Sequence, residues 1–319
     1  MLMRCLVAGL VQISLMALCA GVASAQSYPD KPIRVLTTTT GGPNDLASRL
    51  IAEGVMGSLG QRMIVENRAV VGVEVAAKAP PDGYTLLHYT NVLWLMPLFR
   101  DGVPWDPVRD FAPITLTMTQ PSIVVVHPSV PVTSIKELIA LAKARPGELN
   151  YPTSAIGGAS HLSSELLKAM AGINIVQIPY KGTAPAIAAL LGGQVHLQFE
   201  GGASLTPYLK SGRLRPLAVT TLQPSVLFPD LPTVESSGLP GFESTQMNVV
   251  FSAIRTPDAN IRRLNQEMVR FLNRPEAKEK LLAAGVELVA SSQEELGAKM
   301  KTDMAKWGKL IKDLGIRLD

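Results

Sequence analysis

Three segments of the sequence combine glycine with hydroxyl or amide side chains at points where an apolar run gives way to a helical pattern. They are residues 37–45 (TTTTGGPND), 154–161 (SAIGGASH) and 179–185 (PYKGTAP). The start of a helix presents about four unpaired backbone N–H groups and roughly half a unit of positive charge. Glycine lets a ligand approach this backbone closely, and hydroxyl groups add hydrogen-bond donors. Turns of this composition are suited to holding an anion such as a carboxylate.

Each of these turns is also compatible with an ordinary helix cap that binds no ligand, because Asn and Asp are common at helix starts. The first turn lacks the Gly-Lys-Ser/Thr ending of a nucleotide-binding P-loop and the spaced glycines of a dinucleotide site. Three donor-rich helix starts in one chain nevertheless favour a shared ligand. They meet at one cleft if the strands before them end at facing edges of the sheets.

Strand-like and helix-like segments alternate along most of the chain. Helical patterns lie between apolar runs, and Ser134 with Glu137 has the spacing of a helix-capping box. After residue 258 two helical segments flank a short strand at 286–290. This order predicts an α/β fold of mainly parallel sheets with helices on both faces. The apolar strand-like runs cover residues 33–36, 63–67, 84–89, 122–128, 173–180, 194–200 and 214–221.

Two extended runs, at residues 120–128 and 244–253, are candidates for strands that pass between two lobes. A chain of 319 residues is long enough for two lobes with separate cores. We therefore expect one lobe to comprise residues 26–126 and 250–319, and the other to comprise residues 127–249.

The N-terminus has the features of a secretory signal peptide. A basic residue is followed by a mostly apolar run at 6–18, and Ala-Ser-Ala at 23–25 matches the small-x-small cleavage rule. The apolar run is shorter than the ~20 residues of a membrane-spanning helix. We expect residues 1–25 to be a signal peptide and the mature protein to reside in the periplasm. Cys5 and Cys19 both lie in this segment, so no disulfide or thiolate site is expected.

The charge balance argues against a nucleic-acid partner. The sequence has 30 Lys and Arg against 26 Asp and Glu, and no stretch concentrates the basic residues. His88, His127 and His196 lie in strand-like runs, and no two histidines have a metal-binding spacing. We therefore expect no metal and no cofactor.

Longer motifs extend across nearly the whole mature chain. They include YPDKPIRVL, GGPNDLASRLIAE, PPDGYTLL, PWDPVRDFAPIT, SIKELIALAKARPGELNY, IPYKGTAPAIAALLGGQV, FPDLPTVESSGLPGFE and AKWGKLIKDLGI. Together they resemble the periplasmic solute-binding proteins of tripartite tricarboxylate transporters, the Bug or TctC-like family. The resemblance implies a type II periplasmic-binding-protein fold with two lobes joined by two crossing strands. It also implies capture of a small carboxylated solute and delivery to transporter subunits in the membrane, and we expect a monomer.

The resemblance further implies ligand-binding residues on both sides of a cleft. In the first lobe these are Thr38, Thr39, Thr40, Gly41, Gly42, Asn44, Asp45, Thr90 and Asn91. In the second lobe they are Ser154, Gly158, Ser160, His161, Gly182, Thr183 and Glu200.

Several features depart from the family pattern. Residues 38–40 are threonines where the family usually has Phe-Pro-Pro or a similar sequence, and the loop at 69–72 is about four residues short. Glu200 stands where an aspartate is usual, and Met247 stands where an aromatic residue is common. These departures leave the ligand open between a dicarboxylate, a tricarboxylate and an aromatic acid.

Some side chains have two candidate roles. His161 could donate to a carboxylate or cap its own helix. Glu200 could accept a hydrogen bond from the ligand or pair with Lys181. Tyr89 and Trp94 could face an aromatic acid, and Trp94 also fits the core of a lobe.

A periplasmic hydrolase is the rival functional class. Ser160 and His161 are adjacent, so their side chains diverge on a helix, and no Gly-x-Ser-x-Gly elbow is present. Another interpretation keeps the binding fold but passes the signal to a membrane sensor kinase. The sequence and its resemblance together predict a non-enzymatic protein that closes its cleft around a carboxylated solute and supplies a tripartite tricarboxylate-type transporter.

Overall fold

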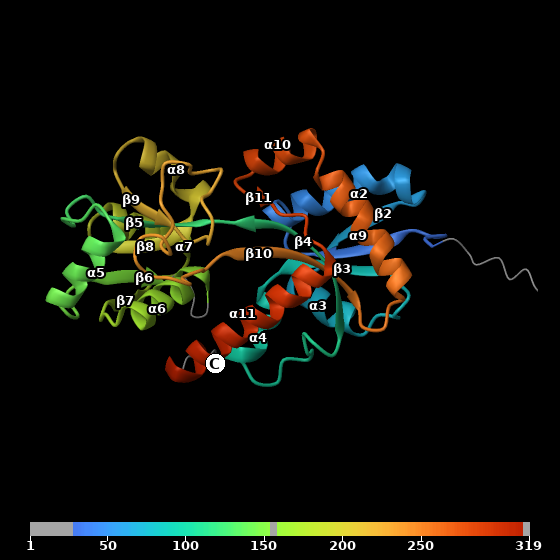
Figure 1. The fold of residues 1–319 in the computed structure, drawn as a ribbon, viewed down its shortest axis with the longest axis horizontal. Coiled ribbons are helices and arrows are strands. Elements are labelled where there is room, and N and C mark those ends of the chain that lie inside the picture. Colours follow the sequence, from blue (N-terminus) through green and yellow to red (C-terminus); the bar gives the residue numbers. More distant parts are fainter. Residues whose placement is uncertain (1–27, 154–157, 315–319) are drawn as a thin grey trace, which may run out of the picture.

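The computed structural model describes residues 28–153 and 158–314, which form two lobes arranged side by side (Figure 1). The expected signal peptide, at residues 1–25, lies outside the described part of the chain. Among the described helices, none is both long and apolar enough to cross a membrane.

The first lobe is built on six strands: β1 (Ile33–Thr37), β2 (Met63–Asn67), β3 (Thr85–Thr90), β4 (Phe111–Gln120), β10 (Gln246–Ala253) and β11 (Glu287–Leu288). They form one sheet in the order β11-β4-β10-β3-β1-β2. Strands β2, β1 and β3 are parallel, whereas β10 is antiparallel to both β3 and β4. Because β1 and β3 are parallel neighbours, the segments that follow them emerge at the same edge of the sheet.

The second lobe has five strands: β5 (Ser122–Val126), β6 (Asn150–Thr153), β7 (Val176–Pro179), β8 (Leu197–Gly201) and β9 (Arg215–Val219). Strand β5 is antiparallel to β8 on one side and to β9 on the other, while β6 and β7 are parallel. His196 N donates to Asn150 O, which places β6 beside β8. The chain enters this lobe between Gln120 and Ser122 and leaves it just before Gln246.

Helices cover both faces of each sheet. In the first lobe α2 (Pro43–Leu59), α9 (Asp258–Leu272) and α10 (Pro275–Ala283) pack on one face, and α3 (Ala69–Ala77), α4 (Val92–Phe99) and α11 (Gln293–Leu314) on the other. In the second lobe α5 (Ile135–Ala144) and α6 (Ala159–Ala171) lie on one face, and α7 (Thr183–Leu191) and α8 (Gly202–Lys210) on the other. One apolar core continues from the α4 and α11 face of the first lobe into the α5 and α6 face of the second.

The element order follows the sequence pattern in most of the chain. The expected strand-like runs do not include β4 or β6, and residues 69–72, expected as a loop, form the start of α3. Two further local differences concern α4 and β7. The pattern does not predict α4, because Pro97 lies inside it and proline disfavours helix interiors. Trp94 is completely buried on this helix, and burial of its apolar face overrides the low propensity. The expected strand at 173–180 is shorter: β7 covers Val176–Pro179, and Ile173 and Ile175 are buried ahead of it.

The start of α2 is held to the sheet by a chain of buried hydrogen bonds. Ser48 Oγ on α2 lies 2.8 Å from His88 Nδ1 on β3. His88 Nε2 lies 3.0 Å from Thr117 Oγ1 on β4, and Thr117 Oγ1 donates to Asn248 O on β10 at 2.9 Å. All four side chains are buried, so the network fixes α2 against three strands at once.

Burial keeps the His88 ring neutral, because it lowers the pKa of His88 to about 3. A neutral imidazole has one N–H donor and one acceptor nitrogen, so one ring nitrogen donates and the other accepts in the contacts with Ser48 and Thr117. The neutral imidazole therefore links α2 to the sheet through hydrogen bonds at both of its nitrogen atoms.

The buried His88 makes the stability of the fold depend on pH. Its folded-state pKa lies below the unfolded value of 6.5, so the unfolded chain binds more protons between the two values. Stability from the neutral ring is complete above that unfolded value and is lost progressively as pH falls toward the folded value. We expect this group to lower the free energy of unfolding, measured in urea, by about 1.5 kcal/mol between pH 6.5 and pH 5.

The variant His88→Gln should lose that part of the pH dependence, whatever its absolute stability. The matched control, His127→Gln, removes a histidine outside the network and should keep it. An equally steep dependence in His88→Gln and the wild type would show that the buried ring is not responsible.

Candidate functional site

The first turn, residues 38–42 between β1 and α2, is closed from inside by Asp45. Asp45 Oδ2 accepts a hydrogen bond from Gly41 N at 3.0 Å, and Oδ1 accepts one from Asn67 Nδ2 at 2.9 Å. Arg49 adds an ion pair at 3.0 Å. Burial acts to raise the pKa of the Asp45 carboxyl, but these donors outweigh it and hold the pKa below its usual value. The ionised carboxylate shapes the turn and uses the Gly41 amide internally.

The outer part of this turn remains accessible. Residues 38–42 are exposed or partly exposed. No side chain caps α2 and Pro43 has no N–H, so Asn44 and Asp45 provide the first amides that lack an intrahelical partner. Asn44 itself is buried, and its Oδ1 has no hydrogen-bond partner within the described chain. The turn therefore offers hydroxyl groups and two helix amides.

The end of β3 is tied to the crossing strand β10. Asn91 N donates to Met247 O at 3.0 Å, and Asn91 Oδ1 accepts from Met247 N at 3.3 Å. Asn91 Nδ2 also donates to Thr245 O at 3.4 Å. The side chain of Asn91 thus has a structural role, whereas Thr90 is only partly buried beside it.

The second turn leads into α6. This helix begins at Ala159 after Gly158, and no side chain caps it. Ser160 is partly exposed. His161 is buried, and burial lowers the pKa of its ring. A neutral His161 therefore brings no positive charge to the start of this helix.

The third turn leads from β7 into α7. Gly182 has a φ of 106°, a conformation that non-glycine residues rarely adopt, and Thr183 after it is exposed. Ser154, the remaining predicted residue of the second turn, lies outside the described residues.

Glu200 lies at the carboxyl end of β8. It accepts hydrogen bonds from Gly201 N at 3.0 Å and from Gln198 Nε2 at 3.1 Å. Burial raises the pKa of the Glu200 carboxyl, although these two donors act in the opposite direction. Both partners are neutral and Lys181 is not one of them, so the expected alternative ion pair is absent between these described residues.

Three of the predicted residues meet at a cavity of about 130 Å³ between the lobes. Thr90 and Asn91 come from the end of β3, and Gly158 comes from the start of α6. The other described site residues predicted from the sequence do not line this cavity. Its remaining walls are Val92 and Leu95 of α4, Ala159 and Leu162 of α6, Trp307 of α11, and Ser244, Thr245 and Gln246 ahead of or at the start of β10.

Of the two roles that the sequence left open for Trp94, the structure shows packing in the core, and a different tryptophan lines the cavity. Trp94 is completely buried, and its Nε1 donates to Asp303 Oδ2 at 2.8 Å. Trp307 lines the cavity, and its Nε1 donates to Asp303 Oδ1 at 3.0 Å. Tyr89 is also buried. The polar run at 244–246, inside an extended crossing segment, is the signal that could have identified one wall of the cavity.

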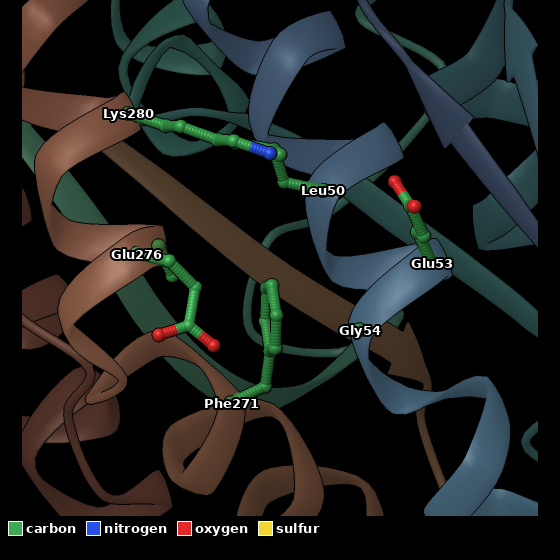
Figure 2. A pocket seen from close by; sticks show the side chains of 7 residues that line it. Leu50, Glu53, Gly54, Phe271, Glu276 and Lys280 are labelled. Atoms are coloured by element: carbon green, nitrogen blue, oxygen red, sulfur yellow. The ribbon is translucent and has the colours of Figure 1, made fainter.

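A second hollow, of about 180 Å³, lies between α2 and α10 (Figure 2). Its apolar base is the Phe271 ring. This ring can pack against α2 because Gly54 has no Cβ; a Cβ at this position would lie 2.0 Å from the ring. Glu53 from α2 and Glu276 and Lys280 from α10 surround the hollow and are exposed. No second-lobe residue contributes, so this hollow belongs to the packing of one lobe.

Comparison with known proteins identifies the family. A model of the tripartite tricarboxylate transporter family receptors matches residues 47–316. The chain belongs to this family.

Relatives of this receptor family extend along nearly the whole chain. Protein BugT of Bordetella pertussis is 32% identical over 313 residues, which cover 94% of this chain and 95% of BugT. A UPF0065 protein from the tcbD-tcbE intergenic region of Pseudomonas sp. (strain P51) is 33% identical over 291 residues, covering 89% and 87% of the two chains. The structure of R. palustris Rpa4515 with adipate shares 33% identity at a TM-score of 0.72, covering 91% and 99%.

Membership of this family confirms the main expectations. The fold is that of the two-lobed periplasmic binding proteins, with two strands crossing between the lobes. Members are solute-binding proteins rather than enzymes, which sets the hydrolase interpretation aside.

The charge on Asp45 is predicted to stabilise the first turn. We expect Asp45→Asn to lower the free energy of unfolding at pH 7 by about 1–3 kcal/mol, since it weakens charge-assisted hydrogen bonds at a buried position. The folded pKa of Asp45 is depressed, so this contribution is present above its unfolded pKa and is lost as pH falls through the folded value.

Urea denaturation at pH 7 and pH 3 measures both effects. The control Asp230→Asn removes an exposed carboxylate and should change stability little. A variant at position 45 as stable as the wild type at pH 7 would contradict the role of this carboxylate.

Proposed function

We propose that this protein captures a small carboxylated solute between its lobes and delivers it to a tripartite tricarboxylate-type transporter. The observation that carries the proposal is the cavity lined jointly by Thr90 of the first lobe, Gly158 of the second lobe and the crossing segment 244–246. Lobe interfaces of this kind are common positions for small-molecule sites. The presence of adipate, a dicarboxylate, in the structure of Rpa4515 supports a carboxylated ligand.

Neutral donors are proposed to hold the carboxylate. The uncapped start of α6 presents the amides of Ala159 and Ser160, which have no partners within the helix. Thr90 supplies a hydroxyl group at the cavity wall. None of the described lining residues is a lysine or arginine. Helix amides are therefore proposed as the main groups that stabilise the negative charge of the ligand.

Export is proposed to depend on residues 1–25. Their basic start, apolar run and Ala-Ser-Ala ending fit a cleaved signal peptide. The mature protein would then meet its solute and its transporter in the periplasm.

The binding site is tested by filling the α6 side of the cavity. Gly158 has φ −70° and ψ 164°, an extended conformation open to any side chain, so Gly158→Leu introduces no backbone strain. We expect titration calorimetry to show adipate binding to the wild type and at least about tenfold weaker binding to Gly158→Leu. The melting temperature of the unliganded variant should stay within about 4 °C of the wild type.

The matched control is Gly57→Leu, at an exposed helix position with open space around it. It should bind adipate as the wild type does. The site would be wrong if Gly158→Leu kept full affinity. The proposed function would be wrong if neither adipate nor any tested dicarboxylate, tricarboxylate or aromatic acid bound the wild type.

Closure is proposed as a rotation about the crossing strands, and the strand order defines its two sides. In the first sheet β3 and β11 lie on opposite sides of the β4–β10 pair, and in the second β8 and β9 flank β5. The cavity lies on the side of β3 and of β6, which neighbours β8. On the other side, Glu287 Oε1 of β11 accepts from Ser225 Oγ at 2.5 Å and from Leu227 N at 3.3 Å.

This Glu287 contact is proposed to resist closure. Residues 38–45 have no hydrogen bond or ion pair to the second lobe among the described interactions, whereas Glu287 joins the lobes behind the crossing strands. Rotating two rigid bodies together on one side of an axis separates them on the other. Closing the cavity would therefore break the hydrogen bonds of Glu287.

Removing the Glu287 contact is predicted to tighten binding. We expect Glu287→Ala and Ser225→Ala each to lower the Kd for adipate about three- to tenfold, since an opposing charge-assisted hydrogen bond is lost. Small-angle scattering should give a smaller radius of gyration for the unliganded variants than for the wild type.

The control Glu279→Ala removes an exposed carboxylate from α10, on the same lobe. It should change neither Kd nor radius of gyration. Weaker adipate binding by Glu287→Ala and Ser225→Ala, with unchanged scattering, would contradict a closure that opens this side of the molecule.

A further inference from the structure

The cavity between the lobes has an apolar wall made by three helices. Leu95 of α4, Leu162 of α6 and Trp307 of α11 contribute side chains that are at most 5% exposed. Val92, at the start of α4, adds a side chain that is 38% exposed. This wall lies next to Gly158 and the start of α6, where the carboxylate is proposed to sit.

Trp307, Ser244 and Asn91, three of the residues with polar groups in and behind this wall, already have partners inside the protein. Trp307 Nε1 donates to Asp303 Oδ1 at 3.0 Å, and Ser244 Oγ lies 2.6 Å from Ser163 Oγ. The side-chain amide of Asn91 is hydrogen-bonded to the crossing segment through both its nitrogen and its oxygen. A hydroxyl group or a second carboxylate placed against Leu95, Leu162 and Trp307 would lose water and gain no hydrogen bond from these three side chains.

We propose that this wall is the subsite for the hydrocarbon part of the solute. The preferred ligand is a carboxylate that carries a single ring, or an unbranched chain of about four to six carbons, next to its charged group. The inference rests on the proposed function, because it takes the carboxylate to be held at the start of α6.

The volume of the cavity limits the size of the hydrocarbon group that it can hold. Its volume of about 130 Å³ is close to that of an engineered apolar protein cavity of about 150 Å³ that holds one benzene molecule. A fused two-ring system exceeds this volume, and a tricarboxylate would bring further charges against the apolar wall. Each methylene group buried in such a wall improves affinity about fourfold.

Benzoate and acetate test the subsite, because both carry one negative charge and differ only in the hydrocarbon part. We expect calorimetry or competition against adipate to give a Kd at least about thirtyfold lower for benzoate than for acetate. Val92→Phe fills the cavity from the α4 side and should reduce that ratio at least about tenfold. The ratio is insensitive to a general loss of affinity or stability.

The matched control is Val75→Phe, because Val75 is a valine of α3 with the same 38% exposure that does not line the cavity. It should keep the wild-type ratio. Equal affinities for benzoate and acetate in the wild type, or an unchanged ratio in Val92→Phe, would overturn the subsite and leave the proposed function intact. No binding of benzoate, acetate or adipate would overturn both.

Discussion

The whole arrangement depends on the pairing between β4 and β10. One strand carries the chain out of the first lobe, the other brings it back, and the two pair from Phe111–Ala253 at one end to Gln120–Gln246 at the other. Because both crossings are hydrogen-bonded to each other, the lobes are joined by a paired ribbon rather than by two loose linkers, although its register shifts at Asn248/Val249 and Val250/Phe251. We expect relative motion of the lobes at the few residues beyond the ribbon. Lys299 of α11 steadies one exit, through its ion pair with Glu243.

This constraint explains where a ligand is best placed. The end of β3 and the start of α6 meet at the cavity beside the ribbon. Two acidic residues at the predicted turns are not available to bind a cation. The carboxylate of Asp45 accepts a hydrogen bond within its own turn, and burial raises the pKa of the Glu200 carboxyl. Amides and hydroxyls are therefore the groups proposed to bind the solute. Donors of this kind bind an anion without a desolvated ion pair, which suits the proposed release of the solute to a transporter.

Much of the fold was predictable, because it follows from local patterns. Alternating apolar runs predicted the α/β order apart from β4 and β6, and Ser134 caps α5 by accepting from Glu137 N as expected. The long motifs then gave the family. Helix α4 was not predictable, because Pro97 disfavours a helix in the local sequence. The helix forms because side chains such as Trp94 are buried against the core.

The candidate site was less accessible to sequence reasoning. Glycine-rich turns point to helix starts, and Gly158 does line the cavity. No local pattern shows that the Gly41 amide is taken by Asp45, or that Trp307, 149 residues from Gly158, supplies an apolar wall. These facts arise from packing between segments distant in the sequence. The most direct test is a crystal structure with bound adipate or benzoate. We expect a carboxylate within about 3 Å of the amides at the start of α6, between the two lobes; a ligand bound elsewhere, or amides turned away from it, would contradict the proposed site.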